Sequence, residues 1–303
     1  AGSSNHDRPL TGPLPTRRFP FKMNRPANEQ RSRVVIHADD LGETVEITRG
    51  ILQGMDAGRV TSTSLMANMP GTDLAIEEAA RRGKNGSFGV HLVLCEGPTL
   101  TRPRTLSDAR GEFLPKRTVG LRGLTRRLDL EAVEAELRAQ IRRIVEGGVQ
   151  VSHFDSHKHL HQLPGVRDVV AKLARDFGVR RVRCTLEDDV WPEGVSLGAW
   201  PSRMIRVRMA RQARELFAAS GLRHPERFFD VRQLMEQDRD RRIALLTHPA
   251  ALSEMVCHPG TPEADREKPG SCNRHDELQF LISTEFADLM NEAGVDLVTY
   301  WDC

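Results

Sequence analysis

The stretch VSHFDSHKHLHQL, residues 151–163, holds four of the eleven histidines in the chain. His157, His159 and His161 alternate, so their side chains would share one face of an extended segment, and the first and last would also share a face of a helix. Either arrangement can gather imidazoles around a divalent ion such as zinc, with a carboxylate completing the set. A solvated polar loop is the alternative, but this density of histidines beside Asp155 favours a metal site.

Two adjacent carboxylates, Asp39 and Asp40, stand in the sequence ADDLG at 38–42. Neighbouring residues on a strand point to opposite faces, so both can reach one pocket only if the chain leaves the strand there, as Gly42 would help it to do. The same letters also suit a turn or a helix cap, which makes the pair a weak signal on its own.

Two further histidines lie in apolar segments, His91 in GVHLVL and His258 in VCHPG. On spacing alone, a buried histidine bonded to a backbone carbonyl explains His91 as well as metal binding does. One Asp and two His leave open positions on a divalent metal, and the pKa of a water bound there falls toward about 7. A second Asp can then act as general base and another histidine as acid, so the set fits metal-assisted hydrolysis without identifying the bond that is cleaved.

Alternating strands and helices are expected to position these residues. Strand-like segments occur at 33–40, 61–70, 87–94, 151–157, 179–184, 253–259 and 296–302. Helical patterns separate most of them, which predicts an α/β protein with a mainly parallel sheet, closed or nearly closed into a (β/α) barrel; an open doubly wound sheet is the alternative. In either fold the carboxyl ends of the strands meet at one rim, where the two aspartates, His91, His157 and His258 would lie.

Composition indicates a globular protein without a strong charge bias: 39% of residues are hydrophobic, 28% are charged, and the formal net charge is +2. This balance argues against a nucleic-acid partner. No apolar run approaches the ~20 residues that span a bilayer, and no signal pattern opens the chain, so we expect no transmembrane segment and a cytoplasmic location. Five scattered cysteines predict free thiols rather than disulfides or structural zinc.

Residues 1–31, rich in Pro, Arg and small polar residues, are predicted to form a mobile tail, in part of cloning origin, with Met23 as a candidate native start. Residues 32–303 are expected to form a single domain. The segment around 186–232 stands out within it, because it is rich in arginine and marked by Trp191 and Trp200.

Several separated motifs together resemble one family. They are ADDLG at 38–42, TSTSLMANMP at 61–70, GVHLVLCEGPTL at 89–100, HFDSHKHLHQLP at 153–164, MVCHPG at 255–260 and HDELQFL at 275–281. Their order and approximate spacing resemble the YdjC-like carbohydrate deacetylases, a family that includes chitooligosaccharide deacetylases and a branch associated with hopanoid biosynthesis. The resemblance runs from about Arg33 to Asp302. It implies a distorted TIM-like (β/α) barrel, often a homodimer, that hydrolyses an N-acetyl group from an amino sugar or glycoconjugate with one divalent metal ion.

The resemblance also implies roles by position. Asp40, His91 and His157 would be the metal ligands, Asp39 the general base, and His258 the acid or oxyanion stabiliser. Zinc is the favoured metal, and magnesium, manganese, cobalt or nickel also suit two histidines and one carboxylate.

Three further residues have expected roles near the substrate. His159 and His161 would support the ligands or contact substrate, and Arg183 resembles a sugar-contacting arginine. The segment 186–232 departs from the family pattern, so the identity of the acceptor sugar is the property that the resemblance predicts least well. The remaining alternatives are a metal-dependent phosphoesterase or amidohydrolase on a related barrel, and a non-catalytic carbohydrate-binding protein.

Overall fold

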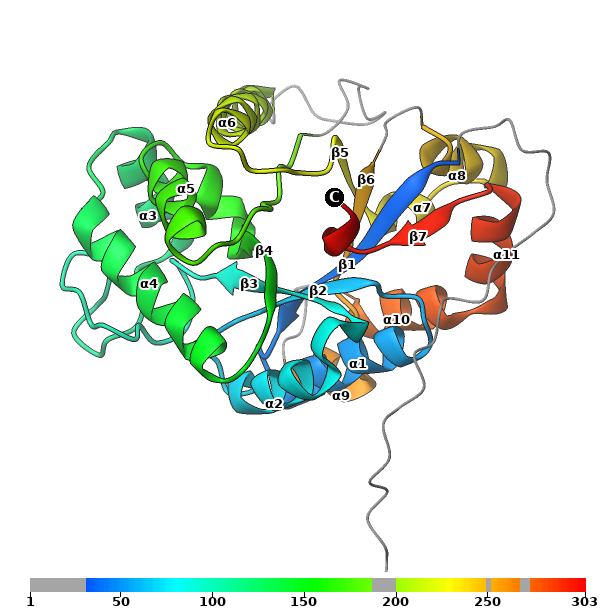
Figure 1. Cartoon of the computed structure of the whole chain (residues 1–303), viewed down its shortest axis with the longest axis horizontal. Helices are drawn as coiled ribbons and strands as arrows, with labels where there is room; N and C mark the ends of the chain where they lie inside the picture. The colour runs from blue at the N-terminus through cyan, green and yellow to red at the C-terminus, as the bar shows by residue number, and fades with distance from the viewer. Residues whose placement is uncertain (1–30, 187–199, 249–251, 268–272) are drawn as a thin grey trace, which may run out of the picture.

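The computed structural model describes residues 31–186, 200–248, 252–267 and 273–303, with the side chains of 200–202 left out (Figure 1). Nearly all of the predicted tail, residues 1–31, therefore lies outside the described residues. So do Trp191 and the side chain of Trp200.

A parallel sheet of seven strands forms the centre of the molecule. Its strands are β1 Arg33–Leu41, β2 Ser62–Leu65, β3 Ser87–Leu92, β4 Val151–Ser156, β5 Arg227–Asp230, β6 Ser253–Cys257 and β7 Asp296–Val298. The order is β4-β3-β2-β1-β6-β5, and β7 pairs with the beginning of β1. Strand β1 lies at the centre of the sheet and is buried along almost its whole length. The two adjacent aspartates near its end therefore lie inside the protein.

Helices surround the sheet, as Figure 1 shows. They are α1 Val45–Asp56, α2 Thr72–Arg82, α3 Lys116–Leu124, α4 Leu130–Glu146, α5 Val166–Asp176, α6 Trp200–Ala219, α7 Val231–Met235, α8 Arg239–Leu246, α9 Pro262–Glu267, α10 Arg274–Ile282 and α11 Thr284–Glu292. Their amphipathic patterns account for the packing: α5, for example, buries Val166, Val170 and Leu173 and turns its charged side chains outward.

The two edges of the sheet are joined through residues 181–186. The backbone N–H of Phe154 in β4 donates to the Arg181 carbonyl at 3.0 Å, and that of Arg183 donates to the Phe154 carbonyl at 2.9 Å. On the other side, the N–H of Phe228 in β5 donates to the Leu186 carbonyl at 3.3 Å. The predicted strand at 179–184 forms isolated bridges instead of a full ladder. The α/β, distorted TIM-like barrel in a single domain is confirmed.

Some details differ from the sequence-based expectation. Helices α3 and α10 were not expected as separate elements, because short helices with little amphipathic pattern give weak periodic signals. The cysteines in the described residues are free, as predicted. No helix in the described part of the chain has the length and apolarity to cross a bilayer.

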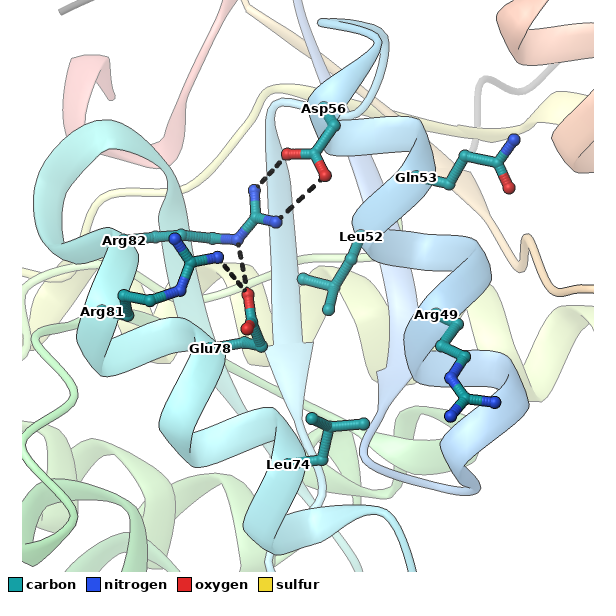
Figure 2. Close-up of a pocket in the computed structure, with 8 residues that line it drawn as sticks. All are labelled: Arg49, Leu52, Gln53, Asp56, Leu74, Glu78, Arg81 and Arg82. Carbon is teal, nitrogen blue, oxygen red and sulfur yellow. Dashed lines mark hydrogen bonds and ion pairs between the residues drawn. The ribbon is translucent and has the colours of Figure 1, made fainter. Parts of the chain in front are cut away.

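A groove on the surface lies between α1 and α2 (Figure 2). Across it, the Arg82 guanidinium donates to both carboxylate oxygens of Asp56, at 2.6 and 3.2 Å, and also to Glu78 at 3.3 Å. Most charged side chains of this groove pair with one another, Arg49 pairs with Glu46 outside the groove, and none of the predicted site residues lines it.

Candidate metal and catalytic site

The end of β1 brings the carboxylates of Asp39 and Asp40 toward one site. Asp40 has a φ of 69°, and the pairing of β1 with β2 shifts register between Ala38 and Leu41. A left-handed residue interrupts the alternation of side chains along a strand. The chain thus leaves the regular strand, as predicted, but it does so at Asp40 as well as at Gly42, whose φ is 93°.

The histidine-rich segment after β4 forms neither an extended strand nor a regular helix. The 3₁₀ segment His157–Gln162 contains Lys158 and His159 with φ values of 57° and 59°. These left-handed residues send the alternating histidines in different directions. His157 faces the end of β1, whereas His159 packs its ring edge-on against Phe228, with 5.5 Å between the ring centroids.

His161 is buried away from the other two histidines. Its Nδ1 lies 2.6 Å from the Ser156 hydroxyl and its Nε2 lies 3.0 Å from the Arg183 carbonyl oxygen. Burial lowers the pKa of His161 to about 4, and that of His159 to about 3. Both rings are therefore neutral at physiological pH.

Asp40, His91 and His157 converge from three strand ends. Asp40 Oδ1 lies 3.4 Å from His91 Nε2 and 3.1 Å from His157 Nδ1, and all three residues are buried. His91 Nε2 makes no hydrogen bond within the described residues. Its Nδ1 lies 3.0 Å from both Asp155 Oδ1 and the Ser64 hydroxyl. An imidazole held at one nitrogen by a carboxylate, with the other nitrogen open beside a second carboxylate, is typical of a metal ligand.

The electrostatics of this trio favour a cation. Burial alone would lower the pKa of His91, but the charges of Asp155 and Asp39 outweigh it and raise the pKa to about 10. Burial alone would raise the pKa of Asp40, but its hydrogen bond with His157 and the nearby His91 imidazole hold it well below its usual range. The donor set and the negative surroundings therefore fit a divalent ion.

Asp39 lies beside the trio with different partners. Arg183 donates to both of its oxygens, at 2.9 and 2.6 Å. Burial would raise the pKa of Asp39, but the Arg183 and His91 charges outweigh it and lower the pKa to about 2. His258 Nε2 lies 3.9 Å from Asp39 Oδ2, so the predicted base and acid candidates border the same space.

Arg183 itself is completely buried. Besides Asp39, its guanidinium contacts Asp155 at 3.0 Å and Glu254 at 2.8 Å. These carboxylates engage all three of its nitrogens, and this arrangement favours a role in orienting Asp39 over the expected contact with a sugar.

The YdjC-like protein family matches residues 33–292. That match covers most of the chain and all of the site described above. The chain belongs to the YdjC-like family.

Curated relatives of this YdjC-like chain carry the name carbohydrate deacetylase. One from Geobacillus stearothermophilus is 33% identical over 275 residues, covering 88% of this chain and 96% of the relative. Another, from Listeria monocytogenes serotype 4a, is 29% identical over 273 residues, covering 89% and 99%. A crystal structure titled as a putative cellobiose-phosphate cleavage protein from Enterococcus faecalis V583 shares the fold, with a TM-score of 0.70, 24% identity and coverage of 90% and 98%.

Two residues at the YdjC-like site were missed by sequence reasoning. Glu96 Oε2 lies 2.8 Å from His157 Nε2 and 3.0 Å from Lys158 Nζ. Arg274, at the start of α10, donates to Asp40 Oδ2 at 2.7 Å. Glu96 stands within the motif at 89–100, which is a usable signal, whereas Arg274 only adjoins the motif at 275–281 and stands 234 positions from its partner.

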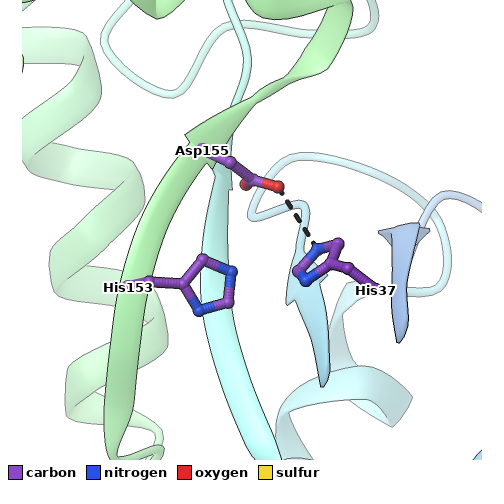
Figure 3. Close-up of side chains that lie close together, drawn as sticks. All are labelled: His37, His153 and Asp155. Atoms are coloured by element: carbon purple, nitrogen blue, oxygen red, sulfur yellow. Dashed lines mark ion pairs between the residues drawn. The ribbon is translucent and has the colours of Figure 1, made fainter. Parts of the chain in front are cut away.

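A second cluster lies within the barrel of the YdjC-like chain, where Figure 3 shows His37, His153 and Asp155 close together. Their ligand atoms are near enough to hold a metal ion. However, the two ring nitrogens of His37 lie 3.0 and 3.1 Å from the hydroxyls of Ser62 and Ser64. His37 Nε2 also lies 3.3 Å from Asp155 Oδ2, so this imidazole already has partners on both sides.

Proposed function

We propose that this YdjC-like chain is a metal-dependent hydrolase that removes an N-acetyl group from an amino sugar, an oligosaccharide or a glycoconjugate. The observation that carries the proposal is the convergence of Asp40 Oδ1, His91 Nε2, which makes no hydrogen bond within the described residues, and His157 Nδ1 directly beside a second carboxylate, Asp39. The names of the curated relatives supply the carbohydrate and the acetyl group.

Asp40, His91 and His157 would hold one divalent ion. When bound, such an ion lowers the pKa of a water molecule and polarises a carbonyl oxygen. Two imidazoles and one carboxylate suit zinc best, and magnesium, manganese, cobalt or nickel are the other candidates. Glu96 and Asp155 contact the second nitrogen of His157 and His91, respectively, and so orient both rings.

Asp39 is the proposed general base. Arg183 fixes the orientation of its carboxylate with two hydrogen bonds, and the pKa of about 2 keeps it ionised at neutral pH. A carboxylate of such low basicity accepts a proton only from an acidified water, so the base has to stand next to the metal ligands. Its adjacency to Asp40 in the sequence and the break in β1 meet that requirement.

His258 is the proposed acid or oxyanion stabiliser. It directly follows β6, and its backbone N–H donates to Glu277 Oε2 at 2.6 Å, which anchors the residue. Its side chain is 19% exposed, so the ring borders both Asp39 and solvent. From there Nε2 can donate a proton to the leaving amine or a hydrogen bond to the developing oxyanion.

The other predicted residues support these groups. His161 bonds the Arg183 carbonyl and thereby supports the arginine that holds Asp39. His159 Nδ1 is buried without a hydrogen bond, which leaves this residue as the better candidate of the two for a substrate contact. A homodimer and a cytoplasmic location stay predictions, and analytical ultracentrifugation tests the first of them.

Acetate release from a panel of N-acetylated sugars and glycolipids, after metal stripping and re-addition, tests the proposal. We expect release only with metal restored, with one ion bound per chain. If Asp39→Asn and His157→Ala both retain full activity, the assignment is wrong. More than one tightly bound ion per chain would favour the phosphoesterase or amidohydrolase alternative. Glycan binding without turnover would favour a carbohydrate-binding protein.

A further inference from the structure

Two helices beside the candidate site are strongly basic. Residues 113–128, which contain α3, include five cationic side chains and no Asp or Glu. Helix α6 includes five arginines and a single acidic residue, Glu215. The formal net charge of the whole chain is only +2, so this positive charge is a local feature of these segments.

The same two helices expose apolar side chains. Leu121 and Leu124 on α3 are 65% and 45% exposed, and Met204 and Ile205 on α6 are 52% and 44% exposed. They make up four of the seven large hydrophobic side chains exposed within the described residues. Leu121 and Leu124 are three residues apart and lie on one face of α3, opposite the buried Val119 and Gly123. Exposed apolar residues on helices rich in cations are typical of an interaction surface.

Both helices adjoin the segment that carries the histidines. A side chain added at Gly123 of α3 would meet Leu163 at 2.9 Å, so the helix packs closely against the end of that segment. Phe217 of α6 stacks on His161, with 6.2 Å between ring centroids.

The basic side chains of these elements also act on one another. Burial lowers the pKa of Lys116 at the start of α3, and the charges of Lys158 and Arg206 lower it further. Repulsion between like charges is relieved when an anionic partner binds beside them.

We propose that the exposed face of α3 and α6 is a docking surface for an anionic phospholipid bilayer. Cationic side chains would contact the head groups, while Leu121, Leu124, Met204 and Ile205 would enter the boundary with the acyl chains. Apolar and basic residues together match a lipid surface better than a nucleic acid, which has no acyl region to receive exposed leucines.

Co-sedimentation with vesicles tests the proposal without any substrate, so its result is independent of the proposed deacetylation. We expect the protein to sediment with vesicles of phosphatidylglycerol and phosphatidylcholine but not with phosphatidylcholine alone, and added salt to weaken binding. Leu121→Asp with Leu124→Asp, and Arg206→Glu with Arg208→Glu, should each lower partitioning about tenfold or more.

Matched variants on other faces serve as controls. Arg239→Glu with Arg241→Glu on α8 changes the net charge as much as the α6 double variant does, and Val145→Asp on α4 replaces another exposed apolar residue; both should bind as the wild type does. Circular dichroism and thermal unfolding check that each variant folds. The proposal would be overturned if the α3 and α6 variants bound vesicles as well as the wild type does or if binding did not depend on phosphatidylglycerol. Binding only to a polyanion such as duplex DNA would also overturn it.

Discussion

Two buried clusters of histidine and aspartate lie close together in this YdjC-like protein, and they differ in how well their hydrogen bonds are satisfied. In the cluster of His37, His153 and Asp155, both nitrogens of His37 have serine hydroxyls as partners. In the cluster of Asp40, His91 and His157, the buried Nε2 of His91 has no hydrogen bond. Residue types alone do not separate the two clusters, since both could hold a metal ion by proximity.

The difference teaches how to rank such clusters. A buried polar atom without a partner costs about 1–3 kcal/mol, so a fold retains one mainly where a ligand completes it. By this measure the cluster at the strand ends is the better candidate for the proposed metal site, and the cluster around His37 is better described as a structural network. His153 Nε2 also lacks a hydrogen bond, but its ring stacks on Tyr300 with 3.7 Å between centroids, and burial lowers its pKa well below the usual value.

The largest expected effect comes from removing a proposed metal ligand from the cluster of Asp40, His91 and His157. His91→Ala should abolish stoichiometric metal binding and lower acetate release by about a thousandfold or more, because metal activation of water supplies several kcal/mol. Metal content by mass spectrometry and acetate release measure the two effects. The matched variant His37→Gln should keep one ion per chain; loss of the ion in that variant alone would reverse the ranking of the clusters.

Asp39→Asn should separate metal binding from catalysis. Removing a general base typically lowers the rate by about a hundred- to ten-thousandfold, whereas the Asp40, His91 and His157 ligands stay in place. Calorimetric titration with metal and single-turnover acetate release make the comparison. If the variant loses its metal as well, Asp39 is a ligand and the two adjacent carboxylates do not have separate roles.

His37→Leu should act mainly on stability. It removes the hydrogen bonds of His37 with the Ser62 and Ser64 hydroxyls and its contact with Asp155 from a buried polar network, and we expect the free energy of unfolding to fall by about 1–3 kcal/mol. Urea unfolding measures the change. His37→Gln, which can bond the serines, should recover part of it, and equal stability of the two variants would contradict the network.

The smallest expected effect concerns His161, which resembles His37 in having partners at both nitrogens. Its pKa of about 4 in the folded protein lies below the value of about 6.5 expected for an unfolded chain. The unfolded state therefore binds more protons between these values, and stability falls as the pH decreases through this window. The ionisation of His161 should therefore make the free energy of unfolding about 1 kcal/mol lower at about pH 5.5 than at about pH 7.5.

The unfolding free energy at several pH values tests this. His161→Gln keeps hydrogen-bonding capacity without the ionisation, so its stability should depend less steeply on pH between about 4 and 6.5. An unchanged slope would show that this imidazole does not titrate as its burial requires.

Much of the fold and the positions of the strand-end residues could be predicted from the sequence. Alternating patterns located β1, β3, β4 and β6, and residues that end parallel strands must meet at one rim. The alternation of His157, His159 and His161 would put them on one face only of an extended segment, and left-handed residues within the 3₁₀ segment turn them apart instead. No local spacing encodes that turn, since neither Lys158 nor His159 is a residue type that demands a positive φ.

The sequence by itself determined which chemical groups stand at the strand ends: two adjacent carboxylates and histidines separated by long stretches of chain. Only the tertiary structure decided which histidine nitrogen has no hydrogen bond and which carboxylate Arg183 holds. It also decided that Glu96 contacts His157 and that Arg274 contacts Asp40. Those pairings join residues 61 to 234 positions apart. The register of the sheet and the closure of the barrel determine them, because contacts at such separations depend on how strands pack and not on local periodicity.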